Sequence, residues 1–154
     1  MSLSGWSNKA ELRRMVITDR SQNPQNFLNE LEVDTIEKTH VKLQNLSTSC
    51  TDNFDIYLLV KNNTIKDAKF NGEGCVISTT STDFLLSELI DKKIDSAITM
   101  LKAYLALVET GKNNSKLPEN LSLFDEVHKQ ANRIPCASNA SRIILNYLQK
   151  IQGK

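Results

Sequence analysis

Residues 52–75 of this 154-residue chain read DNFDIYLLVKNNTIKDAKFNGEGC, and this stretch decides the fold. Apolar residues occupy every second position of its first half: Phe54, Ile56, Leu58 and Val60. A period of two is typical of a β-strand that buries one face. The pair Asn62-Asn63 can adopt the positive φ angles of a tight turn. The stretch therefore predicts two antiparallel strands, Asp52 to Lys61 and Ile65 to Asn71.

Outward from this hairpin, the apolar residues predict one further strand, over residues 39–46, and several helices. The helical segments repeat apolar residues every three to four positions. They cover residues 8–19, a segment that opens near residues 75–79, and residues 94–108, 121–130 and 140–151. Strands followed by helices indicate an α+β fold, in which a three-stranded antiparallel sheet has helices packed on one face.

The composition is that of one ordinary domain, which we expect to span residues 1–154, with residues 1–7 flexible and residues 111–119 forming an insertion loop. With 40% hydrophobic residues and a net charge of +1, the chain is expected to fold and not to bind nucleic acid. It has no apolar run of the roughly 20 residues that a membrane helix needs. Residues 1–10 lack the apolar core of a signal peptide, so we expect a cytoplasmic protein without membrane contact.

The three cysteines are the chemically informative residues. Disulfides are rare in the cytoplasm, so the thiols favour metal or sulfur chemistry. Cys50 precedes the strong strand, Cys75 lies between the last strand and a helix, and Cys136 precedes the last predicted helix. None lies inside an apolar stripe, where a core cysteine would be expected. Because all three are at the ends of elements, they can converge on one site built from loops.

The residues around the cysteines support such a site. Asp52 can reach the same side as Cys50 in an extended segment, and three thiolates with one carboxylate are a plausible zinc ligand set. Gly72 and Gly74 allow close backbone approach beside a ligand. A helix that starts at Cys75 would favour its thiolate, with Ser78 or Thr79 as the predicted cap. Arg133 either offsets the negative charge of the site or is an ordinary solvated arginine.

These motifs resemble the SufU branch of the IscU/NifU amino-domain family of iron–sulfur assembly proteins. The resemblance covers residues 8–150 and rests on three segments, Cys50-Thr51-Asp52, Gly72-Glu73-Gly74-Cys75-Val76-Ile77-Ser78 and Arg133-Ile134-Pro135-Cys136-Ala137. It implies a SufE/NifU-like fold. The interval of 61 residues between Cys75 and Cys136 suits the SufU type, which has an insertion there.

The chain departs from the family pattern at several positions. Pro135 stands where the IscU type has a histidine, so a histidine ligand from that position is excluded. Thr51 replaces the family's glycine, and Ser47-Thr48 replace its asparagine-proline. SufU-type members often carry leucine and tryptophan where this chain has Asn139 and Ser141, so a patch facing a partner is expected to differ.

The resemblance implies a protein that accepts sulfur from a cysteine desulfurase and serves downstream iron–sulfur acceptor proteins. Zinc or a transient [2Fe–2S] cluster would be bound by Cys50, Asp52, Cys75 and Cys136. The protein would be no stand-alone enzyme, and at most a zinc-dependent sulfurtransferase that acts with a desulfurase. We expect Cys136 to be the sulfur acceptor, because it would lie in a mobile loop after a long polar connection.

Two other functions remain open. A purely structural zinc protein would also use cysteines, although such sites often contain paired C-x-x-C knuckles, which this chain lacks. A hydrolase with a cysteine nucleophile needs a histidine base. The two histidines, His40 and His128, fit ordinary edge or surface positions, and His128 is the one to check as a substitute ligand.

Overall fold

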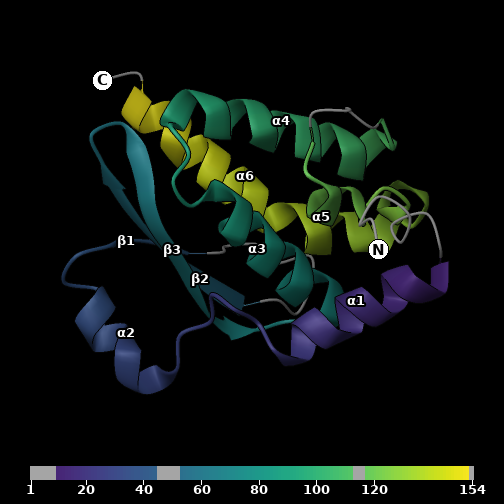
Figure 1. Cartoon of the computed structure of the whole chain (residues 1–154), viewed down its shortest axis with the longest axis horizontal. Coiled ribbons are helices and arrows are strands. Elements are labelled where there is room, and N and C mark those ends of the chain that lie inside the picture. The colour runs from purple at the N-terminus through teal and green to yellow at the C-terminus, as the bar shows by residue number, and fades with distance from the viewer. Residues whose placement is uncertain (1–9, 45–52, 113–116, 153–154) are drawn as a thin grey trace.

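The computed structural model describes residues 10–44, 53–112 and 117–152. Two helices precede three consecutive strands, and the remaining helices follow them (Figure 1). In chain order the elements are α1 (Ala10–Gln22), α2 (Glu30–Ile36), β1 (Val41–Gln44), β2 (Asn53–Lys61), β3 (Thr64–Glu73), α3 (Val76–Leu89), α4 (Ile94–Thr110), α5 (Glu119–Ser122), the 3-10 helices η2 (Val127–Lys129) and η3 (Ala131–Arg133), and α6 (Ile134–Gln152).

The sheet is the predicted hairpin with one further antiparallel strand, in the order β1-β2-β3. Asn62 and Asn63 both have positive φ, at 53° and 62°, as the tight turn requires. Phe54, Ile56 and Leu58 are buried, so the period-two prediction is confirmed for these positions. A register shift between Leu59 and Val60 interrupts the alternation, and Val60 is only partly buried.

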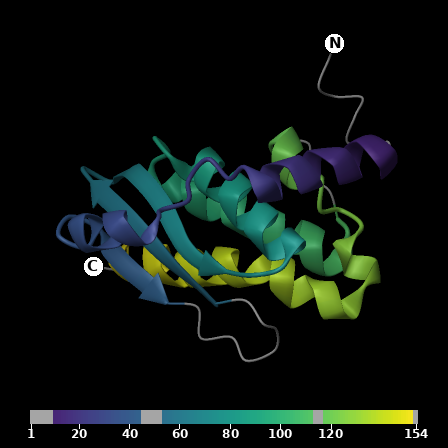
Figure 2. The ribbon, with the colours of Figure 1, turned by 90° about the horizontal axis from the view of Figure 1, so that it is seen from below.

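The helices form a layer on one face of this sheet, which confirms the predicted α+β architecture. Helix α3 packs between α1 and α6, and α4 packs along α6 (Figure 1). Figure 2 shows the strands toward one end of the molecule and α1 toward the other. Helix α2 stands apart from the layer and buries none of its residues.

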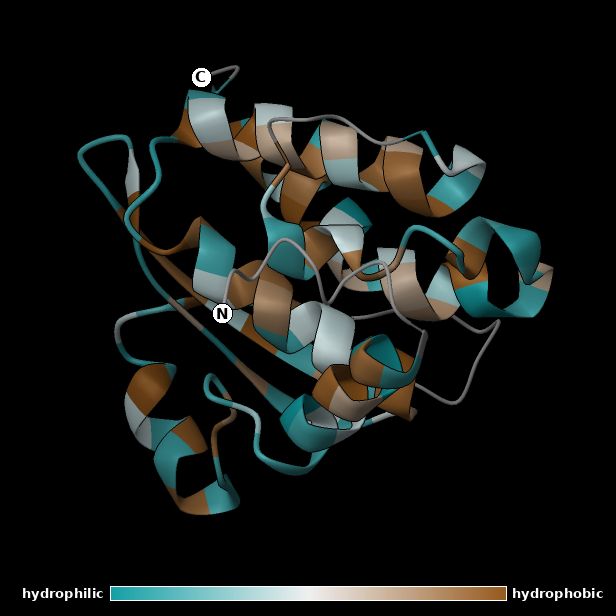
Figure 3. Ribbon diagram, turned by 45° about the vertical axis from the view of Figure 1, so that its right-hand side comes forward, coloured by the Kyte–Doolittle hydropathy of each residue, from teal (hydrophilic) through white to brown (hydrophobic). Residues whose placement is uncertain are grey.

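One continuous apolar core joins the sheet to this helical layer. Hydrophobic segments alternate with hydrophilic ones along α4 and α6 (Figure 3), as expected for helices that bury one side. Fully buried large side chains come from both layers: Ile56, Leu58, Ile65, Phe70, Leu85, Leu86, Leu89, Leu101, Leu107 and Phe124. No helix in the described part of the chain combines the length and hydrophobicity of a membrane span.

Several predicted boundaries are wrong. Residues 30–36 form a helix that was not predicted, because it is short and its capping box, Asn29 with Glu32, is its main local signal. Residues 121–130 form a helical turn and a 3-10 segment instead of one helix. Helix α6 begins at Ile134, six residues earlier than predicted. The expectations for residues 1–7 and 113–116 lie outside the described residues.

A buried carboxylate holds α1 and the following segment against α3. Asp83 is 0% exposed and accepts hydrogen bonds from Arg20 Nε, from the backbone N–H of Gln25 at 2.9 Å and from that of Asn26 at 2.8 Å. The same segment continues along the free edge of β3. There Asn26 O accepts from the N–H of Phe70 at 2.9 Å. Asp83 therefore connects α1, α3 and the sheet.

We expect Asp83→Ala to lower the free energy of unfolding by about 3–5 kcal/mol, because it leaves the Arg20 guanidinium and two backbone donors without their buried acceptor. Urea denaturation followed by circular dichroism measures this loss. The control is Asp34→Ala on the exposed face of α2, which should change stability by less than about 0.5 kcal/mol. Equal effects of the two substitutions would contradict the role given to Asp83.

Candidate metal and sulfur site

Cys75 caps the N-terminus of α3. It has extended backbone angles, φ −71° and ψ 171°, and its sulfur accepts a hydrogen bond from the N–H of Ser78 at 3.4 Å. The prediction that a helix starts at Cys75 is confirmed. The prediction that Ser78 or Thr79 is the cap is wrong, because the cysteine itself holds that position.

Gly72 brings the strand before Cys75 against the start of β2. Its φ is +124°, and a Cβ at this position would lie 2.0 Å from the carbonyl oxygen of Asn53. Gly72 was expected to allow a close approach beside a ligand, and in the structure its close neighbour is the backbone of β2. Gly74 has no positive φ. Because Asn53 pairs with Glu73, β2 begins beside the segment that leads to Cys75.

Cys136 is the third residue of α6 and only 8% exposed. The expectation that it precedes the last helix in a mobile loop is therefore wrong. Pro135 explains the error, because proline breaks a helix interior but is compatible with the first turn. Cys136, like Cys75, therefore lies at the N-terminal end of a helix.

Ser78 is a neighbour of both Cys75 and Cys136. Ser78 contacts the sulfur of Cys75, with its hydroxyl oxygen 3.4 Å from that atom. It also lines a small cavity together with Cys136, Asn139 and Phe54. Phe54 is the second residue of β2. Two cysteines that are 61 positions apart in sequence thus have a common neighbour, beside the strand that follows Cys50 and Asp52.

The backbone of the first turn of α6 is fixed from two helices. Tyr104 of α4 donates its hydroxyl to Ala137 O at 2.7 Å, and Ser81 of α3 donates to Cys136 O at 3.5 Å. Complete burial raises the pKa of Tyr104 well above its usual value, so its hydroxyl remains a donor at any ordinary pH. These bonds hold Cys136 in position from the backbone side.

Cys50 and Asp52 lie outside the described residues, so the complete predicted ligand set is not tested. Within residues 10–44, 53–112 and 117–152, no three histidine, cysteine or acidic side chains gather as a metal site. The described part supplies two cysteine sulfurs near one serine. Their chemistry fits zinc or an iron–sulfur cluster, both of which favour thiolate ligands. Further donors would have to come from the segment before β2.

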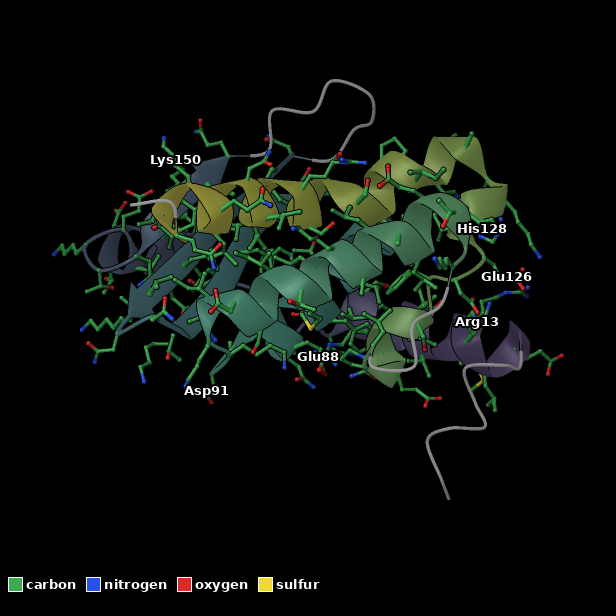
Figure 4. All side chains as sticks on the ribbon, turned by 90° about the horizontal axis from the view of Figure 1, so that it is seen from above. Arg13, Glu88, Asp91, Glu126, His128 and Lys150 are labelled. Atoms are coloured by element: carbon green, nitrogen blue, oxygen red, sulfur yellow. The ribbon has the colours of Figure 1, made fainter. Side chains whose placement is uncertain are left out.

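Arg133 is exposed and lines a groove of about 470 Å³ that also contains Val76, the residue after Cys75. It therefore stands near both cysteine segments. The groove is bounded on the α1 side by Arg13, which forms an ion pair of 3.0 Å with Asp125. Arg13 and Glu126 lie close together at one end of the molecule in Figure 4.

His128 does not join the two described cysteines in a ligand cluster. Its Nδ1 lies 2.7 Å from the carbonyl oxygen of Asp125, to which it donates. Its ring packs so tightly on Gly111 that a Cβ there would come within 2.4 Å. His128 thus supports the end of α4, far from Lys150 at the opposite end of the molecule (Figure 4).

Two polar neighbours of the cysteines were not predicted: Ser78, which contacts Cys75, and Asn139, which lines the cavity beside Cys136. Their spacing carried a signal, because each lies three positions after a cysteine and so on the same helix face. Asn139 and Ser141 were expected to belong to a patch that faces a partner, and this expectation is wrong for Ser141. That residue is 0% exposed, and its hydroxyl donates to Ser138 O at 2.7 Å.

Comparisons with known proteins show the family to which this chain belongs. Residues 13–134 match the model of the NifU-like N-terminal domain. The chain is 31% identical to an uncharacterized protein of Mycoplasma pneumoniae, the MG337 homolog, over 75% of this chain and 83% of that protein. It is 30% identical to the iron–sulfur cluster assembly scaffold protein IscU of Thermotoga maritima, over 67% and 72%. It is 27% identical to the zinc-dependent sulfurtransferase SufU of Bacillus subtilis, over 96% of both.

Solved structures show the same fold. A putative iron–sulfur cluster assembly scaffold protein from Fervidobacterium islandicum superposes with a TM-score of 0.73 at 22% identity, over 86% of this chain and 93% of that chain. A NifU-like protein from Brucella abortus superposes with a TM-score of 0.72 at 14% identity, over 99% of both. At these identities the likeness concerns the fold alone.

We expect Gly72→Ala to lower the free energy of unfolding by about 1–3 kcal/mol, because alanine would be strained at φ +124° and its Cβ would meet the backbone of Asn53. The matched control is Gly74→Ala, two residues away, where no positive φ has to be maintained. Thermal unfolding of both variants measures the difference. Similar melting temperatures for both would show that the β2–β3 contact tolerates a side chain.

Proposed function

Because the chain belongs to the family of NifU-like N-terminal domains, we propose that it is an iron–sulfur cluster assembly protein that accepts sulfur from a cysteine desulfurase. The zinc-dependent name of the Bacillus subtilis relative and the scaffold name of the Thermotoga maritima relative support zinc or a nascent [2Fe–2S] cluster as its metal. Downstream iron–sulfur proteins would receive the sulfur or the cluster.

One observation carries this proposal. Cys75 caps α3, Cys136 lies in the first turn of α6, and Ser78 contacts Cys75 and lines a cavity with Cys136, at the end of the sheet where β2 begins. A protein that only needed buried thiols for packing would have no reason to hold two of them at helix N-termini. The proposed ligands are Cys50, Asp52, Cys75 and Cys136, with Arg133 offsetting part of their negative charge. A bound zinc ion would keep the thiols deprotonated and protected.

The extent of the apolar core argues against a purely structural metal. Buried hydrophobic residues of β2, β3, α3, α4 and α6 form one cluster. This cluster includes neither described cysteine. Small domains that depend on zinc for folding lack such a core. The metal is therefore expected to serve the chemistry of the thiols.

We propose Cys136 as the sulfur acceptor, although the mobile loop first expected for it does not exist. Exposure alone favours Cys75, which is partly exposed while Cys136 is buried. However, the sulfur of Cys75 already serves as a helix cap, and an acceptor must gain a sulfur atom. Cys136 lines a cavity with Asn139 and Ala140, its neighbours on the same face of α6. Sulfur transfer then needs a desulfurase that can reach this turn.

Metal analysis tests the proposed ligand set. Protein produced with zinc and iron both present should contain one metal site, as zinc or as a brown, oxygen-sensitive cluster with acid-labile sulfide. Cys75→Ser and Cys136→Ser should each reduce the bound metal at least about tenfold, because each removes a thiolate. The control is Ser96→Ala, a substitution at an exposed position of α4. Full occupancy in both cysteine variants would contradict the ligand set.

Chelation separates the proposed function from a structural zinc protein. Metal removal should leave the helical circular dichroism signal unchanged at 25 °C, because the apolar core does not include the cysteines. Collapse of the helical signal on chelation would instead support a metal that holds the fold together.

A further inference from the structure

A cavity for one small atom lies beside Cys136. Its volume is about 10 Å³, close to the smallest space that admits a single water molecule. Phe54 and Ile56 of β2 form its apolar side, and Ser78 and Thr82 of α3 form a second side. Cys136, Asn139 and Ala140 of α6 close it, and these three lie at i, i+3 and i+4, on one helix face.

Asn139, one of the residues that line this cavity, has a buried hydrogen-bond donor. Its Nδ2 is buried and has no hydrogen-bond partner among the described residues. Two neighbouring hydroxyl groups already have acceptors. Ser78 donates to Cys75 O at 3.1 Å, and the hydroxyl of Ser81 lies 3.5 Å from Cys136 O. A buried donor without an acceptor is costly, so its retention beside a cysteine points to an acceptor that is present only at some stage.

We propose that this cavity receives the outer sulfur of a persulfide on Cys136, and that Asn139 Nδ2 donates a hydrogen bond to it. This proposal rests on the assembly function and adds the site that holds the transferred atom. A disulfide-type S–S bond is about 2 Å long, so the outer sulfur lies directly beside the cysteine sulfur. The terminal sulfur is an anionic acceptor, which an amide N–H binds more strongly than a neutral one.

The transfer step balances without any added oxidant. The thiolate of Cys136 attacks the outer sulfur of the desulfurase persulfide. The new bond joins that sulfur to Cys136, and the sulfur–sulfur bond of the desulfurase breaks. The desulfurase cysteine leaves as a thiolate. The proton of the transferred sulfur, if present, remains on it or passes to water. Asn139 acts after the transfer, by holding the outer sulfur in a site from which water is largely excluded.

The test measures the lifetime of the Cys136 persulfide. Zinc-free protein is loaded with glutathione persulfide, and samples are alkylated with iodoacetamide at timed intervals. Trypsin then releases each cysteine in a different peptide, because residues 43–61, 70–92 and 134–142 are bounded by lysine or arginine. Mass spectrometry reports the alkylated persulfide on each one.

We expect Asn139→Leu and Asn139→Asp to shorten the lifetime of the Cys136 persulfide about tenfold, because leucine fills the cavity and aspartate replaces the donor with a charge that repels the sulfur anion. The matched control is Asn146→Leu, on an exposed position of the same helix, which should leave the lifetime unchanged. Circular dichroism confirms that each variant is folded. The aspartate variant keeps the shape of asparagine, so it tests the donor even where leucine disturbs packing.

Three other outcomes would be decisive. Lifetimes within twofold of the wild type in both Asn139 variants would overturn the sulfur site. A persulfide found only on Cys50 or Cys75 would also overturn it, while leaving the assembly function in place. If neither glutathione persulfide nor a desulfurase with cysteine produced a persulfide on any cysteine, the proposed function itself would fail.

Discussion

The fold depends on one buried carboxylate. Asp83 has no exposed surface, and a charge in that position is tolerable only because Arg20 and two backbone N–H groups bind it. This arrangement fixes α1 on α3 and directs the chain after α1 along the edge of β3. Helix α3, which is fixed in this way, has Cys75 as its N-cap. The position of the candidate site therefore follows from an interaction two helical turns away from it.

The sequence predicts the sheet and the long helices well because their signals are local. The alternation at Phe54, Ile56 and Leu58 places one face of β2 in the core, and the turn at Asn62-Asn63 sets the pairing. The family resemblance rests on similarly local motifs around the cysteines. Helix α2 was not predicted, because it is short and has no buried residues. Tertiary contacts add little to such an element.

The polar core of α3 and α6 could not be predicted from the sequence. Hydrophobic periodicity treats buried hydroxyls as surface residues, yet Thr80 is 0% exposed and donates to Ile17 O at 2.8 Å, 63 positions away. Ser138 is buried as well, and its hydroxyl donates to Ile134 O at 2.7 Å. Such residues mask the true start of α6. Together with Pro135, they explain why Cys136 was predicted to lie in a loop although it belongs to α6.

Small hydroxyl side chains at the α3–α6 contact have a consequence for the two cysteines. They allow Ser81 to approach the carbonyl of Cys136, so the backbone there is held while its side chain faces a cavity. The sulfur of Cys75, in contrast, forms the cap of α3. A chemical change at Cys75 must therefore alter a helix terminus. The same change at Cys136 leaves both helices with their backbone hydrogen bonds, so these two thiols are structurally unequal before any metal or partner binds.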